Sequence, residues 1–106
     1  NNIAIEPEII DLIKFLKKAG IKIKFLSNRK IEILGKKHLN QISYEIMPDR
    51  IEAGTYMIAS AITNSKLTIK KLNINHVQNT INYLSKANIN LIISTVDFTI
   101  SLFPIE

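Results

Sequence analysis

Apolar residues recur at helical spacing in the first part of the chain and then alternate as in β-strands. Pro7 suits the first turn of a helix, and Gly20 suits a left-handed residue that ends it. Residues 21–25 alternate between apolar residues and lysine, and residues 31–33 return after a polar turn, which predicts a β-hairpin. The apolar positions of the helix are three and four residues apart: Ile9, Leu12, Ile13 and Leu16.

The rest of the chain predicts further strands, two helices and a second hairpin. Residues 42–46 alternate as a strand that stops at Pro48, since proline fixes the backbone and lacks an N–H donor. One helix follows Pro48, and Asn75 is placed to cap the next one. The later helix carries an apolar stripe of Val77, Thr80, Ile81 and Leu84. The remaining strands are expected at 67–69, 89–93 and 98–102, the last two joined by a turn at 95–97.

The helix after Pro48 is the most distinctive predicted element. Asp49 and Glu52 have the spacing of a capping box at its N-terminus. Its residues are almost all apolar or small, which predicts a helix buried on most faces. Its charged residues, Arg50 among them, gather at the N-terminal end, where unpaired N–H groups attract anions. The predicted core stripe of this helix is Ile58, Ala59 and Ile62.

An internal repeat relates the two halves of the chain. Residues 16–21, Leu-Lys-Lys-Ala-Gly-Ile, match residues 84–89, Leu-Ser-Lys-Ala-Asn-Ile, and each stretch leads into a hairpin. The repeat covers 6–34 and 42–103. We therefore expect an α+β fold, a βαβαββ unit preceded by the αββ tail of another, with helices packed on mixed sheets. Absent strands would leave open sheet edges, through which a fragment can self-associate.

Composition indicates a globular chain. Of its residues 46% are hydrophobic and 22% charged, and the net charge of +5 comes from scattered lysines with only two arginines. Cysteine is absent, and His38 and His76 have no ligand partners at suitable spacing, so we predict no metal site. No apolar run is long enough to span a bilayer. The chain begins with Asn1, which suggests a piece of a longer polypeptide, and we expect a cytoplasmic location.

Several stretches resemble the bacterial UDP-N-acetylglucosamine enolpyruvyl transferases, or 1-carboxyvinyltransferases, of the EPSP synthase-like superfamily. The clearest is Pro-Asp-Arg-Ile-Glu-Ala-Gly-Thr at 48–55, which is similar to a signature of that family. Residues 5–12, Ile-Glu-Pro-Glu-Ile-Ile-Asp-Leu, and 19–23, Ala-Gly-Ile-Lys-Ile, also match in order and spacing. The sister family, the 5-enolpyruvylshikimate-3-phosphate synthases, fits these residues less well.

The resemblance implies a fold and a reaction. The family fold consists of βαβαββ units in two lobes, an inside-out α/β barrel, and the lobes cross over near 47–49. The whole of 1–106 would then be one fragment of such an enzyme. The reaction implied is transfer of enolpyruvyl from phosphoenolpyruvate to the 3-hydroxyl of UDP-N-acetylglucosamine in peptidoglycan synthesis, with no cofactor.

The resemblance also implies substrate-binding residues. Asp49 and Arg50 would face the cleft between the lobes, with Glu6 from the Glu-Pro-Glu motif as a further candidate. The family's reactive loop, lysine and substrate-binding arginines have no counterparts here, so this chain holds no catalytic residue and is expected to be inactive alone. Three simpler roles remain open: Asp49 as a helix cap, Arg50 as a solvated residue of the first turn or part of a surface ion pair, and Glu6 as a complement to a helix dipole.

One alternative comes from a different class of protein. A free-standing βαβαββ module could bind RNA, since the chain is basic. Such a module needs exposed aromatic side chains for base stacking, whereas Phe25, Tyr44 and Phe98 are expected to point inward. Nucleic-acid binding is therefore the less favoured interpretation.

Overall fold

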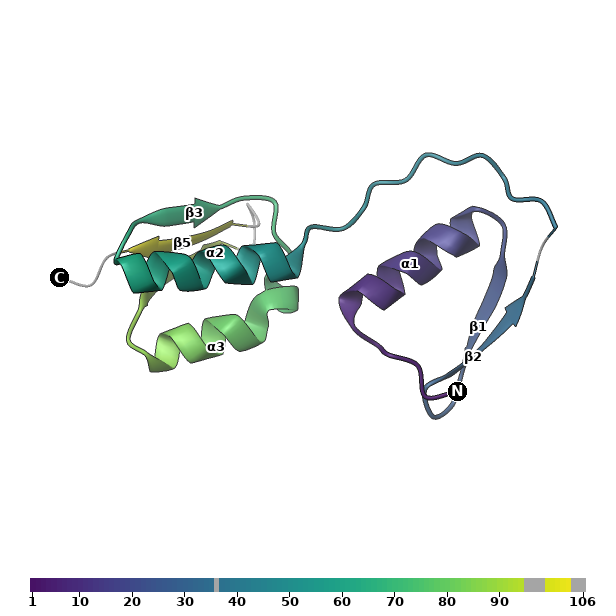
Figure 1. The fold of residues 1–106 in the computed structure, drawn as a ribbon, viewed down its shortest axis with the longest axis horizontal. Coiled ribbons are helices and arrows are strands. Elements are labelled where there is room, and N and C mark those ends of the chain that lie inside the picture. Colours follow the sequence, from purple (N-terminus) through teal and green to yellow (C-terminus); the bar gives the residue numbers. More distant parts are fainter. Residues whose placement is uncertain (36, 95–98, 104–106) are drawn as a thin grey trace. The chain divides into compact units, whose positions relative to one another are not determined.

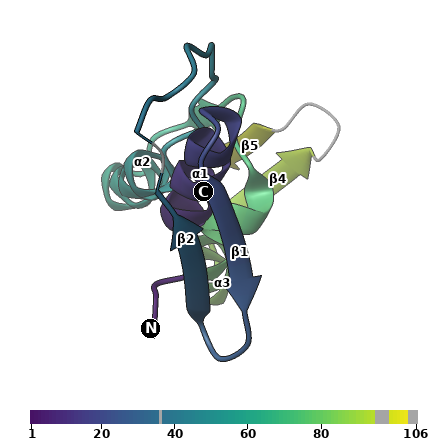
Figure 2. The same cartoon turned by 90° about the vertical axis from the view of Figure 1, so that its right-hand side faces the viewer.

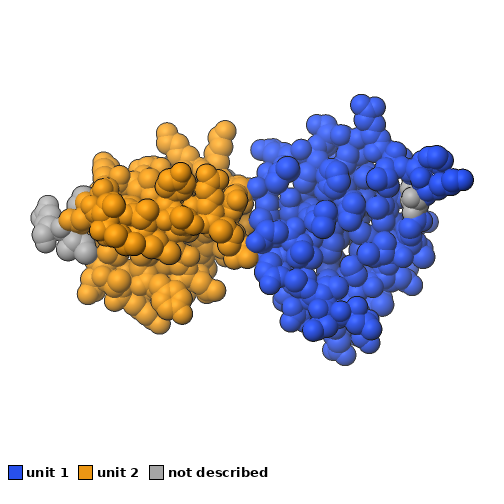
Figure 3. All heavy atoms as spheres, in the orientation of Figure 1, with its two compact units in different colours: residues 1–47 blue, residues 48–106 orange. Residues whose placement is uncertain are grey.

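The computed structural model describes residues 1–35, 37–94 and 99–103 of the chain. These residues form two compact units, Asn1–Met47 and Pro48–Glu106, which are coloured separately in Figure 3. The boundary therefore lies between Met47 and Pro48. It falls within the range 47–49 where a crossover between lobes is expected, although the crossover itself stays a prediction.

The first unit consists of helix α1 (Pro7–Lys18) and the hairpin of strands β1 (Lys22–Leu26) and β2 (Lys30–Leu34). Pro7 is the first residue of α1, as expected. Gly20 has a φ of 98°, and the Ile21 N–H donates to the Leu16 carbonyl at 3.0 Å, so the left-handed helix end is confirmed. Three buried side chains form the small core of this unit: Ile13, Ala19 and Ile23.

The hairpin is antiparallel, as the alternation predicts, and turns through Asn28 and Arg29, which both have positive φ. The N-terminal end of the chain lies near the turn end of the hairpin (Figure 2). It is held there because Ile3 and Arg29 exchange two hydrogen bonds of 2.9 Å. The expectation that Phe25 points inward is wrong, since this side chain is 52% exposed. One helix is too narrow to cover the whole apolar face of a two-stranded hairpin, so some apolar side chains of the strands stay exposed.

The second unit packs two helices on one face of a three-stranded antiparallel sheet (Figure 1). The sheet order is β3–β5–β4. The elements in chain order are α2 (Arg50–Thr63), β3 (Leu67–Ile69), the 3₁₀ helix η1 (Ile74–Val77), α3 (Gln78–Lys86), β4 (Asn90–Ser94) and β5 (Thr99–Phe103). The core consists of Ala53, Met57, Leu72, Val77, Ile81, Leu84, Ile100 and Leu102.

Residues 42–46 do not form a strand, so one predicted strand is wrong. Side chains rather than a backbone ladder hold this stretch, and Tyr44 is its best-anchored residue. The expectation of mixed sheets is wrong for the same reason. Every strand pairing among the described residues is antiparallel, because the strand that would have added a parallel neighbour is not there.

Helix α2 is buried along one side only. Met57 is fully buried, but Ile58 is 48% and Ile62 79% exposed, and Ala59 is exposed as well, so the predicted core stripe of these three residues is wrong. The buried positions of α2 are Ala53, Gly54, Met57 and Ser60. The segment contains enough apolar residues for two buried faces, but this chain supplies a sheet and a second helix for only one of them.

The cap predicted at Asn75 is wrong, because the N-cap residue of α3 is Val77 and it makes no side-chain capping bond. The side chain of Asn73 instead caps the 3₁₀ helix η1, where it accepts from the backbone N–H of Asn75 at 3.1 Å. Helix η1 then leads into α3. The left-handed conformation predicted for Asn88 is confirmed by its φ of 60°. The predicted turn at 95–97 and Phe98 lie outside the described residues. Among the described helices, none combines the length and the apolar composition needed to cross a membrane.

Candidate functional site

Asp49 caps helix α2, as its spacing from Glu52 predicts. Its Oδ1 atom accepts from the N–H of Ile51 at 2.8 Å and from the N–H of Glu52 at 3.0 Å. Both bonds use the same carboxylate oxygen, so Oδ2 takes no part in the cap. Capping and ligand binding by Asp49 are therefore compatible.

A cavity of about 360 Å³ opens beside this cap, within the second unit. Asp49 and Glu52 supply carboxylates to its wall, and the exposed residues Lys70 and Lys71 supply ammonium groups. The full lining is Pro48, Asp49, Glu52, Ala53, Tyr56 and residues 67–72. The cavity can thus offer hydrogen-bond acceptors, cationic donors and an apolar surface to one polar ligand.

Of the residues that line the cavity, only Asp49 was predicted from the sequence to bind substrate, so Glu52, Tyr56, Lys70 and Lys71 were missed in that role. The two lysines are exposed, and they also border the cavity. Lys71 has a φ of 55°, an uncommon conformation for lysine, where the chain turns after β3. The one sequence signal for a binding role of Lys70 and Lys71 was their position directly after the strand predicted at 67–69.

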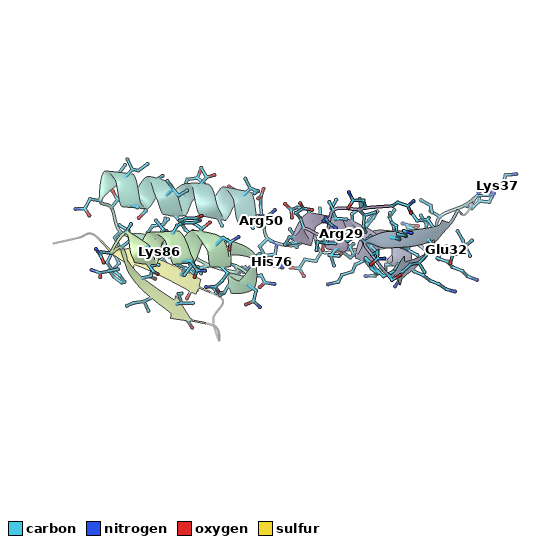
Figure 4. The ribbon with its side chains drawn as sticks, turned by 90° about the horizontal axis from the view of Figure 1, so that it is seen from below. Arg29, Glu32, Lys37, Arg50, His76 and Lys86 are labelled. Atoms are coloured by element: carbon cyan, nitrogen blue, oxygen red, sulfur yellow. The ribbon has the colours of Figure 1, made fainter. Side chains whose placement is uncertain are left out.

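Arg50 is the first residue of α2 and is half-buried. Figure 4 shows it at the N-terminal end of that helix. It does not line the cavity, so the structure places Asp49 there and not Arg50.

Glu6 lies in the first unit, directly before α1. Its backbone carbonyl accepts from the N–H groups of Ile9 and Ile10 at 3.0 and 3.2 Å. Its side chain makes no capping bond and is exposed. The carboxylate is therefore no cap, but its place directly before α1 is compatible with the simpler role of complementing the helix dipole.

A second polar cluster, also missed from sequence, lies within the first unit. The Tyr44 hydroxyl donates to the Asp11 carboxylate at 2.7 Å, and the Met47 N–H faces the other oxygen of that carboxylate at 3.5 Å. The hydrogen bond to Asp11 raises the pKa of Tyr44 above its ordinary value, with smaller contributions from partial burial and from the negative charge. Thirty-three residues separate the two partners, which is why local spacing could not reveal the pair.

The ring nitrogens of His76 lie within the second unit, near the 3₁₀ helix η1. Its Nε2 atom lies 3.2 Å from the Asn73 amide nitrogen, and its Nδ1 atom is buried without a partner in the described part of the chain. The described residues contain no group of three or more potential metal ligands.

Known proteins with similar sequences show the family of this chain. A sequence model of the EPSP synthase family, described as 3-phosphoshikimate 1-carboxyvinyltransferase, matches residues 1–103. The chain belongs to this family of enolpyruvyl transferases. Its similar relatives include the UDP-N-acetylglucosamine 1-carboxyvinyltransferase of Wolbachia sp. subsp. Brugia malayi, which is 51% identical over 78 residues, 74% of this chain and 18% of that enzyme.

Two further relatives carry the same enzyme name. That of Pelagibacter ubique is 45% identical over 86 residues, 81% of this chain and 21% of the enzyme. That of Campylobacter jejuni strain 81-176 is 39% identical over 105 residues, 97% of this chain and 25% of the enzyme. The chain thus spans between a fifth and a quarter of the length of these two relatives.

Proposed function

We propose that this chain is a segment of a UDP-N-acetylglucosamine 1-carboxyvinyltransferase. The whole enzyme would join the enolpyruvyl group of phosphoenolpyruvate to the 3-hydroxyl of UDP-N-acetylglucosamine and release inorganic phosphate. The 3-hydroxyl oxygen of the sugar would form a bond to the central carbon of the enolpyruvyl group and lose its proton. The bond from that carbon to the phosphate oxygen would break, so that phosphate leaves. The main support is the match to the Campylobacter enzyme over 105 residues, nearly the whole chain.

The first test concerns the molecule that accepts the enolpyruvyl group. The family model is described by the 3-phosphoshikimate reaction, whereas the similar relatives are named for UDP-N-acetylglucosamine. The full-length polypeptide that contains this chain should release phosphate from phosphoenolpyruvate only when UDP-N-acetylglucosamine is added. Release with shikimate 3-phosphate instead would reassign the acceptor. No release with either acceptor, beside an active relative assayed in parallel, would overturn the proposal.

Substrate contacts are proposed for three residues. Asp49 has a carboxylate oxygen outside the cap and borders the cavity, which suits it to accept from a substrate hydroxyl. Arg50 would contact an anionic substrate group or clamp the lobes through its guanidinium. Glu6 contributes a carboxylate that the cap of α1 does not use. The catalytic residues would come from other parts of the polypeptide, so the isolated chain should be inactive.

The finer architecture is also proposed. The boundary after Met47 suits a crossover between two lobes, and the exposed apolar side of α2 suits burial by further βαβαββ units of an inside-out barrel. Strands β3 and β4 are sheet edges, through which the isolated chain would self-associate. A cytoplasmic location is proposed together with the use of phosphoenolpyruvate. The relatives reported above are all carboxyvinyltransferases, so RNA binding gains no support.

A further inference from the structure

Helix α2 forms one wall of the cavity in the second unit. Tyr56 follows Ala53 by three residues and Glu52 by four, so these residues share one face of the helix. Asp49 extends this wall to the helix cap with an oxygen, Oδ2, that the cap does not use. The wall therefore combines two carboxylates with the ring of Tyr56, which is 57% exposed.

The chain that leaves strand β3 forms the other wall. Neighbouring residues of a strand point to opposite faces, but the φ of 55° at Lys71 ends this alternation. Lys70 and Lys71 both border the cavity, and both are exposed. Among the described residues, neither ammonium group makes an ion pair or a hydrogen bond. Both positive charges are therefore available to a ligand.

The size and the charges of the cavity limit what it can bind. Its volume of about 360 Å³ lies near the lower end of the range of small-molecule sites, about 300–1,000 Å³, which suits one sugar ring with a phosphate group. Carboxylates accept from hydroxyl groups, ammonium groups bind phosphate, and an aromatic ring offers an apolar surface to ring carbons. A simple anion would be repelled by Asp49 and Glu52, and a neutral sugar would leave both lysines unused.

We propose that this cavity binds a sugar phosphate, with Asp49 and Glu52 on the hydroxyl groups and Lys70 and Lys71 on the phosphate. The identity of the sugar rests on the proposed function, since UDP-N-acetylglucosamine carries N-acetylglucosamine on a phosphate group. The binding chemistry rests on the second unit alone, because every residue that lines the cavity belongs to that unit.

Titration of the 106-residue chain with N-acetylglucosamine 1-phosphate tests the site, with the amides of Glu52, Tyr56 and Lys71 followed by NMR. N-acetylglucosamine and inorganic phosphate should each bind at least about tenfold more weakly, because each meets one wall only. Lys70→Gln and Lys71→Gln should each weaken binding of the sugar phosphate by about tenfold through loss of a charged hydrogen bond. Lys86→Gln removes an exposed lysine of α3 outside the cavity and is the matched control.

Glu52→Ala distinguishes this site from a basic surface patch. It should weaken binding of the sugar phosphate, because a hydroxyl acceptor is lost, but strengthen binding of inorganic phosphate, because a repelling charge is gone. Weakening of both ligands, or an equal loss in Lys86→Gln, would overturn the inference.

The site and the proposed reaction can fail separately. Unshifted cavity amides at millimolar sugar phosphate would refute the site, even if the full-length enzyme turns over UDP-N-acetylglucosamine. Binding at the cavity, beside a full-length enzyme that does not turn over UDP-N-acetylglucosamine, would confirm the sugar phosphate site and refute the proposed reaction.

Discussion

Thr80 on α3 lies where a side chain on Gly54 of α2 would point. A Cβ atom built on Gly54 would come 3.4 Å from the Thr80 hydroxyl oxygen, the first neighbour that it meets. Gly54 thus permits a close approach of the two helices α2 and α3.

The distance predicts opposite effects for two substitutions at Gly54. Alanine fits within ordinary contact distance and improves helix propensity, so Gly54→Ala should raise the free energy of unfolding by up to about 1 kcal/mol. Gly54→Val adds branches against Thr80 and should lower it by about 1–3 kcal/mol. Urea unfolding of both variants checks this, and a loss for alanine equal to that for valine would contradict it.

The two helix ends of the repeat give a second prediction. Gly20 and Asn88 are both left-handed, and each precedes an isoleucine N–H that donates to a leucine carbonyl at 3.0 Å. Asn88→Gly should raise the free energy of unfolding by about 0.5 kcal/mol because glycine adopts positive φ without strain. Gly20→Ala should lower it by about 1–2 kcal/mol. Thermal unfolding of both variants decides the matter, and equal effects of one sign would refute it.

Local signals in the sequence predicted the helix ends and hairpins. Pro7, Gly20 and the Asp49 cap act through neighbours within a few residues, so their roles follow from spacing alone. The three strands at 67–69, 89–93 and 98–102 also appear at or within one residue of their predicted positions.

Features that depend on distant partners could not be predicted in this way. Residues 42–46 have the alternation of a strand, but a strand needs a partner, and periodicity does not say whether one is present. Exposure of Ile62 likewise depends on which segment covers α2. The site was predicted only in part for the same reason: the Asp49 cap is local, whereas Lys70 and Lys71 reach the cavity through the fold.

Tyr44 provides a prediction about pH. Its pKa is raised because the protonated hydroxyl donates to Asp11, so the bond stabilises the first unit below the ordinary tyrosine pKa of about 10 and is lost as pH rises through the raised value. Phenolate absorbance should be followed in a Tyr56→Phe, Tyr83→Phe background, which leaves Tyr44 as the remaining tyrosine of three. Asp11→Asn should lower the Tyr44 pKa, and an identical titration in both proteins would contradict the assignment.

Association of the isolated chain is expected to depend on concentration. Strands β3 and β4 each have one open edge in the three-stranded sheet, so the weight-average mass in sedimentation should rise with concentration. Ile62→Lys changes the apolar side of α2 without touching these edges, and it should associate like the wild type. Loss of association in Ile62→Lys would assign the contact to α2, and a monomer at millimolar concentration would refute association altogether.

The two proposed roles of Asp49 can be separated by two substitutions in the full-length enzyme. Asn caps a helix about as well as Asp, so Asp49→Asn should change the free energy of unfolding by less than about 0.5 kcal/mol, whereas Asp49→Ala should cost about 1 kcal/mol. If the second carboxylate oxygen binds substrate, both variants should lower kcat/KM by a similar factor, because both lose the charge. Wild-type kinetics in Asp49→Asn would leave Asp49 as a cap alone. The carboxylate is thus tested against an amide that preserves the helix, so a kinetic loss in that variant reports on substrate and not on folding.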